Sequence, residues 1–246
     1  MQPPPCRSDW AVFLDLDGTL LEIAETPAQV RIPARVLAAL QNLRSELHGA
    51  LAIVSGRSIA IIDGLLAPVQ LPIAGVHGAE RRDASGRLHT ASASPELAHV
   101  RRALTDFVAK HPRLLLEDKN SALAVHFRRA PELERAVRAA AADALGGAGE
   151  FLQVQEGKMV LEIKPRHASK GEAIARYMLE APFAGRIPAF VGDDVTDEAG
   201  FDMVNRLGGH SIKVGSGESS HARWRLPDVG RVLDWLESCS QRARNE

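Results

Sequence analysis

The first part of the chain alternates short apolar runs with segments whose apolar residues recur at helical spacing. The apolar runs, which we predict to be buried strands, are residues 12–14, 50–54 and 71–76. Residues 33–47 and 58–65 lie between them and are predicted helices, with Pro33 tolerated in the first turn. Strands that alternate with helices in this way favour a parallel sheet with right-handed crossovers.

The pattern changes in the middle of the chain. Residues 81–90 are polar and fit a hairpin or a linker around Gly86. A helix, two strands, a second helix and two further strands are then predicted at 97–110, 114–117, 122–127, 131–145, 151–155 and 159–163. This order is typical of an antiparallel α+β unit. We therefore expect residues 83–164 to form a small domain inserted into a core made of residues 1–82 and 165–246.

The alternation of helix and strand resumes after Pro165. Helices are predicted at 169–179, 197–207 and 228–237, and strands at 188–191 and 211–214. The expected fold class is therefore α/β, a Rossmann-like parallel sheet core with an inserted α+β domain.

The composition limits the possible binding partners and the cellular location of the protein. The net charge of −1 indicates neither a nucleic-acid nor a membrane partner, and no apolar stretch is long enough to span a bilayer. The first residues lack the basic start and apolar core of a signal peptide. The two cysteines, Cys6 and Cys239, lie near opposite ends without metal-ligand spacing. A reducing cytoplasm is the expected location.

Polar side chains suited to chemistry follow three of the predicted strands. They are Asp15 and Asp17, then Ser55, and then Asp193, Asp194 and Asp197. Lys170 begins a predicted helix. Because the carboxyl ends of parallel strands share one edge of a sheet, these groups could converge there. Such an oxygen-rich set suits Mg²⁺ rather than zinc or copper.

The Asp-x-Asp-Gly pattern alone would also fit a surface turn or half of a calcium loop. A calcium loop needs Gly at its sixth position and Glu at its twelfth. Counted from Asp15, Gly18 is fourth and the twelfth residue is Thr26, so the calcium loop is excluded.

As a set, Asp15-Leu16-Asp17-Gly18-Thr19, Ser55, Lys170 and Gly192-Asp193-Asp194 resemble the four motifs of the haloacid dehalogenase superfamily of phosphotransferases. The resemblance implies that Asp15 attacks phosphorus to form an aspartyl phosphate, while Asp17 acts as general acid and then base. It also implies that Lys170 balances charge. The phosphoryl group would be held by Gly18, Thr19, Ser55 and Gly56.

The same resemblance implies a magnesium site. Mg²⁺ would bind the side chains of Asp15 and Asp193 and the backbone carbonyl of Asp17. Of Asp194 and Asp197, one could orient a metal-bound water or Lys170, and the other could cap the helix that begins near residue 197.

The inserted domain resembles the cap of the trehalose-6-phosphate phosphatase family. The motifs that resemble this family are residues 75–80, 117–119, 123–128, 157–165 and 192–198. The resemblance implies that the cap closes over the site and that Glu117, Lys119 and Glu162 bind sugar hydroxyls. Further candidates for sugar contacts are Glu80, His126, Arg128 and Lys158.

Structural roles remain open for several of these residues. Glu117 and Lys119 could form one solvated face with an exposed ion pair, and His126 and Arg128 could support the fold of the cap. Glu80 could instead pair with Arg81 or Arg82.

The expected function is a Mg²⁺-dependent phosphatase that converts trehalose 6-phosphate to trehalose and phosphate, with possible functional coupling to a trehalose-6-phosphate synthase. Two alternatives remain: a phosphatase or phosphomutase for another sugar phosphate, and a non-catalytic sugar-phosphate sensor. The four site residues Asp15, Asp17, Lys170 and Asp193 argue against a sensor, because binding alone requires neither a nucleophile nor an acid.

Overall fold

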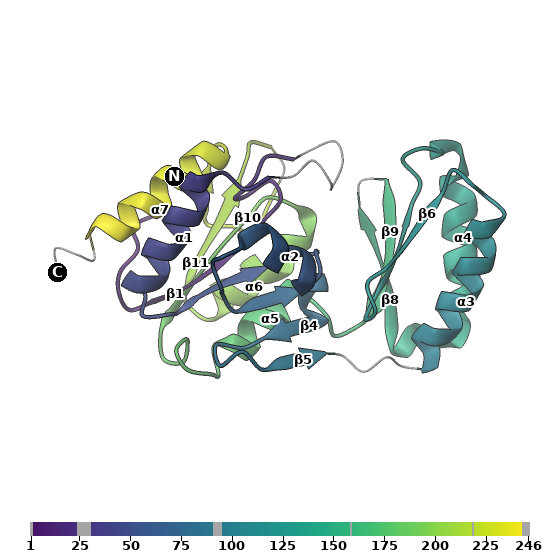
Figure 1. Cartoon of the computed structure of the whole chain (residues 1–246), viewed down its shortest axis with the longest axis horizontal. Coiled ribbons are helices and arrows are strands. Elements are labelled where there is room, and N and C mark those ends of the chain that lie inside the picture. Colours follow the sequence, from purple (N-terminus) through teal and green to yellow (C-terminus); the bar gives the residue numbers. More distant parts are fainter. Residues whose placement is uncertain (1, 24–30, 91–94, 158, 218, 243–246) are drawn as a thin grey trace. The chain divides into compact units, whose positions relative to one another are not determined.

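The chain folds into two compact units, as a computed structural model shows (Figure 1). The structure describes residues 2–23, 31–90, 95–157, 159–217 and 219–242. One unit combines Met1–His89 with Ser169–Glu246, and the other spans Thr90–Ala168. The boundaries therefore fall at residues 89/90 and 168/169, a few residues beyond the expected 82/83 and 164/165. The first boundary lies later because the strand residues Leu88 and His89 belong to the first unit.

The first unit is built on an eight-stranded sheet with the order β12-β11-β10-β1-β2-β3-β4-β5. Its strands are β1 (Trp10–Leu14), β2 (Leu51–Val54), β3 (Ile73–Gly75), β4 (Glu80–Arg82), β5 (Leu88–Thr90), β10 (Ile187–Gly192), β11 (His210–Val214) and β12 (Trp224–Leu226). The strands from β12 to β3 pair in parallel, and β4 pairs antiparallel with β3. Every residue of β1 and β2 is buried, as expected for central parallel strands covered on both faces.

Helices cover both faces of this sheet. They are α1 (Ala34–Glu46), α2 (Ile59–Leu66), α5 (Lys170–Tyr177), α6 (Glu198–Arg206) and α7 (Val229–Arg242), with short 3-10 turns at Val76–Gly78 (η2) and Val195–Asp197 (η5). In Figure 1, α1 and α7 lie side by side, and α5 and α6 lie together on the other face. The start of α5 is capped by the Ser169 hydroxyl, which accepts a hydrogen bond from the Glu172 amide at 3.1 Å.

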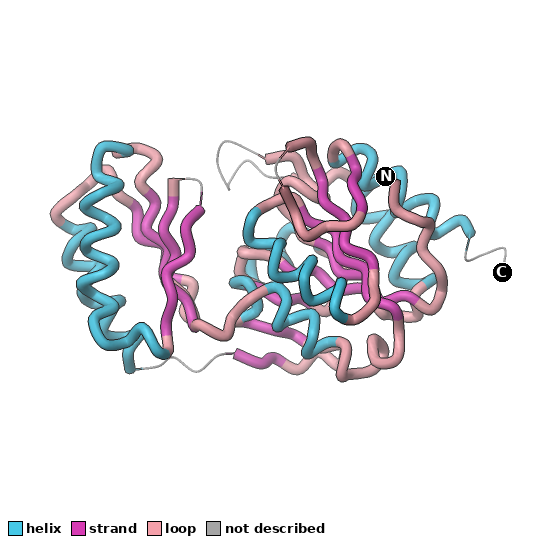
Figure 2. The backbone as a smooth tube through the Cα atoms, turned by 180° about the vertical axis from the view of Figure 1, so that it is seen from behind, coloured by secondary structure: helices cyan, strands magenta, loops and turns pink. Residues whose placement is uncertain are grey.

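The second unit is a four-stranded antiparallel sheet with the order β6-β7-β9-β8. Its elements are β6 (Leu115–Asp118), β7 (Leu123–His126), β8 (Leu152–Gly157), β9 (Val160–Pro165), α3 (Pro95–Ala109) and α4 (Glu134–Leu145), with 3-10 turns at Pro131–Leu133 (η3) and Gly146–Glu150 (η4). Both helices cover one face of the sheet, as Figure 2 shows. A separate apolar core that includes Val100, Leu104, Val125 and Ile163 joins the helices to that face.

Three core strands were not predicted from the pattern. The segment at 81–90, expected to be a hairpin or linker, contains most of β4 and all of β5, which extend the sheet beyond β3. The third strand, β12, pairs in parallel with β11 at the opposite edge. All three have only three residues each and contain polar residues, so they lack the apolar run that marked β3, which is equally short.

The two cysteines, which the sequence leaves without an assigned role, form a disulfide. Cys6 and Cys239 are buried at 5% and 1% exposure and are bonded to each other, which ties the N-terminal segment to α7. Within the described ranges, no helix is both long and apolar enough to cross a membrane.

Candidate active site

The first carboxylates lie where β1 ends and the chain turns. The Asp15 amide donates to the Val191 carbonyl of β10 at 2.9 Å, so Asp15 stays tied to the sheet. The chain then reverses at Gly18, whose φ of +76° suits glycine, and the Gly18 amide donates to the Leu21 carbonyl at 2.7 Å. A Cβ at Gly18 would lie 2.0 Å from an Asp193 carboxylate oxygen. Glycine therefore allows the Asp193 carboxylate to approach the turn after β1.

Lys170 contacts one carboxylate from each half of the first unit's sequence at this edge, Asp15 and Asp197. Its ammonium donates to Asp15 Oδ1 at 2.8 Å and to Asp197 Oδ1 at 2.6 Å, and its side chain is only 3% exposed. Burial alone would lower the pKa of Lys170, but the two carboxylates outweigh it and the pKa is raised. Lys170 is therefore a fixed positive charge beside Asp15.

Asp197 organises this arrangement. Its Oδ2 accepts hydrogen bonds from the backbone amides of Asp193 and Asp194, both at 2.9 Å, while Oδ1 accepts from Lys170. Of the two residues with an open assignment, Asp197 is thus the one that contacts Lys170. Asp194 is exposed and lies at the N-cap position of η5.

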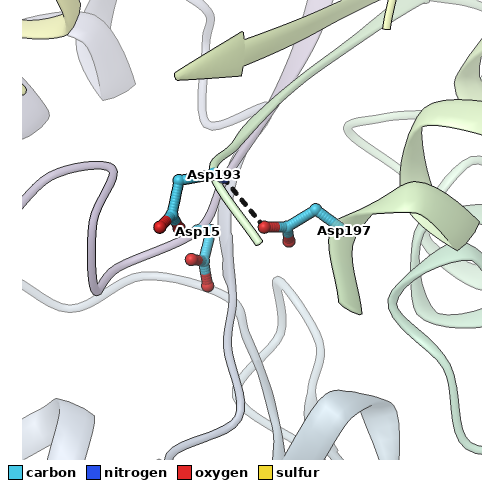
Figure 3. Close-up of side chains that lie close together, drawn as sticks. All are labelled: Asp15, Asp193 and Asp197. Carbon is cyan, nitrogen blue, oxygen red and sulfur yellow. Dashed lines mark hydrogen bonds between the residues drawn. The ribbon is translucent and has the colours of Figure 1, made fainter. Parts of the chain in front are cut away.

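The carboxylates of Asp15, Asp193 and Asp197 are the group best placed to hold a cation. One oxygen from each lies within 4.8 Å of the others, and Figure 3 shows Asp15 and Asp193 next to each other. Because donors from the chain engage both oxygens of Asp197, Asp15 and Asp193 are the better ligands. Burial, together with the neighbouring Asp197 charge, raises the pKa of Asp193 to about 6, and burial also raises the pKa of Asp15. The three carboxylates beside the Lys170 ammonium put more negative than positive charge on oxygen donors here, which fits a hard divalent cation such as Mg²⁺.

The predicted phosphate-binding residues lie beside this cluster. Ser55 is 1% exposed, and its hydroxyl oxygen accepts a hydrogen bond from the Arg57 amide at 3.3 Å, which leaves the hydroxyl proton available to a ligand. Thr19 is fully buried and its hydroxyl lies 3.5 Å from Asp193 Oδ1. A Cβ at Gly56 would lie 2.7 Å from the His77 ring, so only glycine fits between that ring and the Ser55 loop.

Asp17 has a partner that the sequence did not indicate. Arg57 forms a two-point ion pair with it, with Nε–Oδ2 and Nη2–Oδ1 distances of 2.6 Å and 2.7 Å. The side chains of Arg57 and Asp17 are 15% and 37% exposed. The sequence points to Arg57 as a site residue only through its position directly after Ser55 and Gly56. It does not indicate which carboxylate would pair with Arg57.

The second unit carries most of the predicted sugar-binding residues on one face of its sheet. Cross-strand register aligns Glu117 of β6 and Glu162 of β9 on either side of Ala124. Lys119 Nζ lies 2.9 Å from Glu162 Oε1, and both side chains are largely buried. Glu117 Oε2 lies 2.9 Å from His126 Nε2, and this hydrogen bond holds the pKa of Glu117 below its usual value. The face thus presents fixed acidic and basic groups side by side.

Three other sugar-binding candidates lie elsewhere. The Glu80 carboxylate accepts a hydrogen bond from the Ile59 amide at the start of α2, at 3.1 Å, which is neither of the ion pairs considered from the sequence. Arg128 is exposed and follows β7. Lys158 lies outside the described residues. Sugar contacts of all three stay predictions.

The fold and the arrangement of these residues define a class of protein. The chain is similar in structure to a solved phosphatase of the haloacid dehalogenase superfamily from Bacteroides thetaiotaomicron, with a TM-score of 0.62, 14% identity and 92% of each chain covered. At this identity the similarity shows the fold alone. The predicted fold class, a Rossmann-like core with an α+β cap, is confirmed.

The family follows from closer matches. The sequence pattern of the trehalose-phosphatase family matches residues 13–229, and the chain belongs to this family. It is 47% identical to a trehalose-6-phosphate phosphatase of Escherichia coli over 96% of this chain and 88% of that protein. A crystal structure of a trehalose-6-phosphate phosphatase related protein is 27% identical, has a TM-score of 0.78 and covers 95% of this chain and 98% of its own. The predicted enzyme class, a phosphoric monoester hydrolase, is confirmed.

Proposed function

We propose that this protein is a Mg²⁺-dependent phosphatase that hydrolyses trehalose 6-phosphate through an aspartyl-phosphate intermediate. The observation that supports this most is the buried Asp15–Lys170 pair with Asp193 beside it. The 47% identity to a bacterial trehalose-6-phosphate phosphatase supports the substrate. A carboxylate held by a buried lysine beside a second carboxylate suits phosphoryl transfer, which depends mainly on alignment and charge neutralisation.

The reaction has two steps. In the first, an Asp15 carboxylate oxygen forms a bond to phosphorus, the bond from phosphorus to the sugar oxygen breaks, and Asp17 gives its proton to that oxygen. In the second, Asp17 takes a proton from water while the water oxygen bonds to phosphorus and the bond to Asp15 breaks. Phosphate leaves, Asp15 is again a free carboxylate, and Asp17 again carries a proton.

The groups around Asp15 suit both steps. Lys170 places a positive charge 2.8 Å from the Asp15 oxygen and compensates charge on the phosphoryl group. Ser55 and Thr19 supply buried hydroxyl groups to phosphoryl oxygens. Asp15, Asp193 and the Asp17 carbonyl would hold the cation, which when bound offsets negative charge on the phosphoryl oxygens.

Sugar recognition belongs to the second unit in this proposal. Its polar face offers carboxylates and an ammonium group that are already paired, namely Glu162 with Lys119 and Glu117 with His126. Preformed pairs of this kind can accept and donate hydrogen bonds to sugar hydroxyls with little further ordering. A substrate that lacks these hydroxyls would lose the hydrogen bonds to these groups and would bind more weakly.

The location in the cell and functional coupling to a trehalose-6-phosphate synthase stay predictions. The Cys6–Cys239 disulfide bears on the first, because most disulfides are reduced in a reducing cytoplasm. Acid trapping of whole cells, followed by denaturation of the protein and alkylation of its free thiols, would test it. Complete labelling of both cysteines is expected for a cytoplasmic protein, and protection of both would contradict that location.

The substrate is tested with a panel of sugar phosphates, with and without Mg²⁺. We expect phosphate release from trehalose 6-phosphate to exceed release from sucrose, mannose and glucose phosphates, and to be lost after chelation. Equal rates across the panel would refute the substrate, and full activity in excess chelator would refute the metal requirement. The variant Asp15→Asn is expected to bind substrate without turnover, whereas unchanged turnover would refute Asp15 as the nucleophile.

A further inference from the structure

The ion pair between Arg57 and Asp17 gives one of the reacting carboxylates a fixed orientation. Arg57 Nε and Nη2 contact both Asp17 oxygens, at 2.6 Å and 2.7 Å. Two parallel contacts fix the plane of a carboxylate as well as its position, which a single point charge cannot do. Neither the family motifs nor the reaction steps above assign a role to Arg57.

Arg57 is itself held firmly. Its amide donates to the Ser55 hydroxyl oxygen at 3.3 Å, and its carbonyl accepts from the Val76 amide at 2.9 Å. Its side chain is 15% exposed, so the guanidinium is mostly withdrawn from water. An ion pair with one partner this buried and with ideal two-point geometry differs from an ordinary surface pair, which typically contributes very little.

The Asp17 carboxylate is held less firmly by its surroundings than the Asp15 carboxylate. Asp15 is 5% exposed and has Lys170 as a fixed neighbour, whereas the Asp17 side chain is 37% exposed and follows β1 by three residues. A carboxylate in a loop can rotate about its terminal bond. Proton transfer requires the donor oxygen to lie within hydrogen-bond reach of the accepting atom in the correct direction.

We propose that Arg57 is a positioning residue that orients Asp17 for proton transfer to the leaving oxygen, because its fork holds the carboxylate that forms on Asp17 as the proton moves. The inference rests on the proposed function, in which Asp17 is the general acid. It differs from the simplest alternative, in which Arg57 binds the phosphoryl group directly. The two roles predict different responses to the leaving group of the substrate.

A good leaving group separates these roles. The sugar alcohol of trehalose 6-phosphate is a poor leaving group and needs a proton, whereas the phenolate of p-nitrophenyl phosphate leaves without one. Loss of Asp17 alignment should therefore slow the sugar ester much more than the aryl ester. Loss of a phosphate ligand should slow both to the same extent, because both esters carry the same phosphoryl group.

The experiment measures kcat and KM for both esters in R57Q and R57K, with R82Q as the matched control. Arg82 forms a two-point pair with Asp63 at 2.6 Å and 2.7 Å, with similar side-chain exposure of 19% and 41%, and takes no part in the proposed reaction.

For R57Q we expect kcat for the sugar ester to fall about 10- to 100-fold. This loss is smaller than the full contribution of general acid catalysis, because Asp17 is still present. The aryl ester should change by less than about threefold. R57K should lie between R57Q and wild type, because lysine keeps the charge but not the fork. R82Q should leave the ratio of the two rates unchanged.

Combination with D17N completes the test. If Arg57 acts through Asp17, adding R57Q to D17N should cost no further rate on the sugar ester, because residues that act as one unit are not additive. Inhibition by inorganic phosphate should be the same in R57Q and wild type. Equal loss on both esters together with weaker phosphate inhibition would overturn the inference and leave the proposed function intact. If D17N slows the sugar ester and the aryl ester to the same extent, Asp17 is not the general acid. That result would overturn both the inferred role of Arg57 and the proposed role of Asp17.

Discussion

Replacing Lys170 with methionine should destabilise the first unit strongly. Lys170 Nζ contacts both Asp15 and Asp197, at 2.8 Å and 2.6 Å. All three side chains are nearly inaccessible to solvent, at 3%, 7% and 0% exposure. Methionine matches the length and shape of lysine without its charge, so K170M leaves two buried carboxylates without their shared cation.

The expected loss follows from this burial. Removal of one partner from a buried ion pair costs roughly 3–5 kcal/mol, because the remaining charge keeps its desolvation penalty without compensation. The amide groups of Asp193 and Asp194 still donate to Asp197, so the loss should fall within this range rather than above it. At lower pH the loss should shrink, since burial already raises the pKa of Asp15 and protonation removes the unpaired charge.

Urea unfolding followed by tryptophan fluorescence measures this loss in the correct unit. All three tryptophans, Trp10, Trp224 and Trp235, lie in the first unit, so the signal reports unfolding of the unit that contains Lys170. The control is R206M, which removes the exposed 2.6 Å ion pair between Arg206 and Asp202 on α6 of the same unit. It should cost no more than about 1 kcal/mol.

The outcome that would refute this reasoning is a K170M loss below about 1 kcal/mol at neutral pH, comparable with that of the control. A loss of the same size at about pH 5 and about pH 7.5 would also contradict it, because the cost is assigned to ionised carboxylates. Partial recovery of stability in the double variant D15N/K170M is expected, since one of the two unpaired charges is then absent.

Three further predictions concern the metal, the sugar and the disulfide. Because burial raises the pKa of Asp193 to about 6, protons compete with Mg²⁺ below that pH. Mg²⁺ should therefore raise Tm more at about pH 7.5 than at about pH 5, and equal increases would contradict the site. The variants K119M and E162Q should raise KM for trehalose 6-phosphate about 10-fold or more and leave p-nitrophenyl phosphate hydrolysis nearly unchanged; parallel losses on both would exclude a role in sugar binding. The Cys6–Cys239 bond closes a loop with a sequence separation of 233, so the free energy of unfolding of C6S should be lower than that of the oxidised wild type by up to ~5 kcal/mol. Adding a reductant should not change the stability of C6S further, because that variant has no disulfide between these positions. Equal urea midpoints for oxidised wild type and C6S would contradict that estimate.

The sequence predicted the elements that have a clear apolar period and the groups at their ends. Asp15, Ser55 and Asp193 each follow a buried parallel strand, and strand ends in such a sheet share one edge, so their convergence needed no side-chain detail. Lys170 was predictable because it begins a helix at the same edge. Strands β4, β5 and β12 were missed because they are short and contain polar residues, so no apolar run marks them as strands.

Contacts between side chains distant in sequence were not predictable in this way. Asp17 and Arg57 are separated by 40 positions, and their pairing depends on how two loops pack at the sheet edge. Cys6 and Cys239 became partners only because the N-terminal segment lies on α7, which no local pattern encodes. Lys119 and Glu162 were each candidates for sugar contacts, but their ion pair follows from the antiparallel register of β6, β7 and β9.

The central claim is that Asp15 becomes covalently phosphorylated during turnover. Enzyme mixed with trehalose 6-phosphate and Mg²⁺, quenched in acid within the first turnovers and digested, can be examined by mass spectrometry. The account predicts one added phosphoryl group on the peptide that contains Asp15, and none on the same peptide from D15N. A wild-type enzyme that turns over substrate and carries no phosphoryl group on that peptide, or carries it on another residue, would contradict the account.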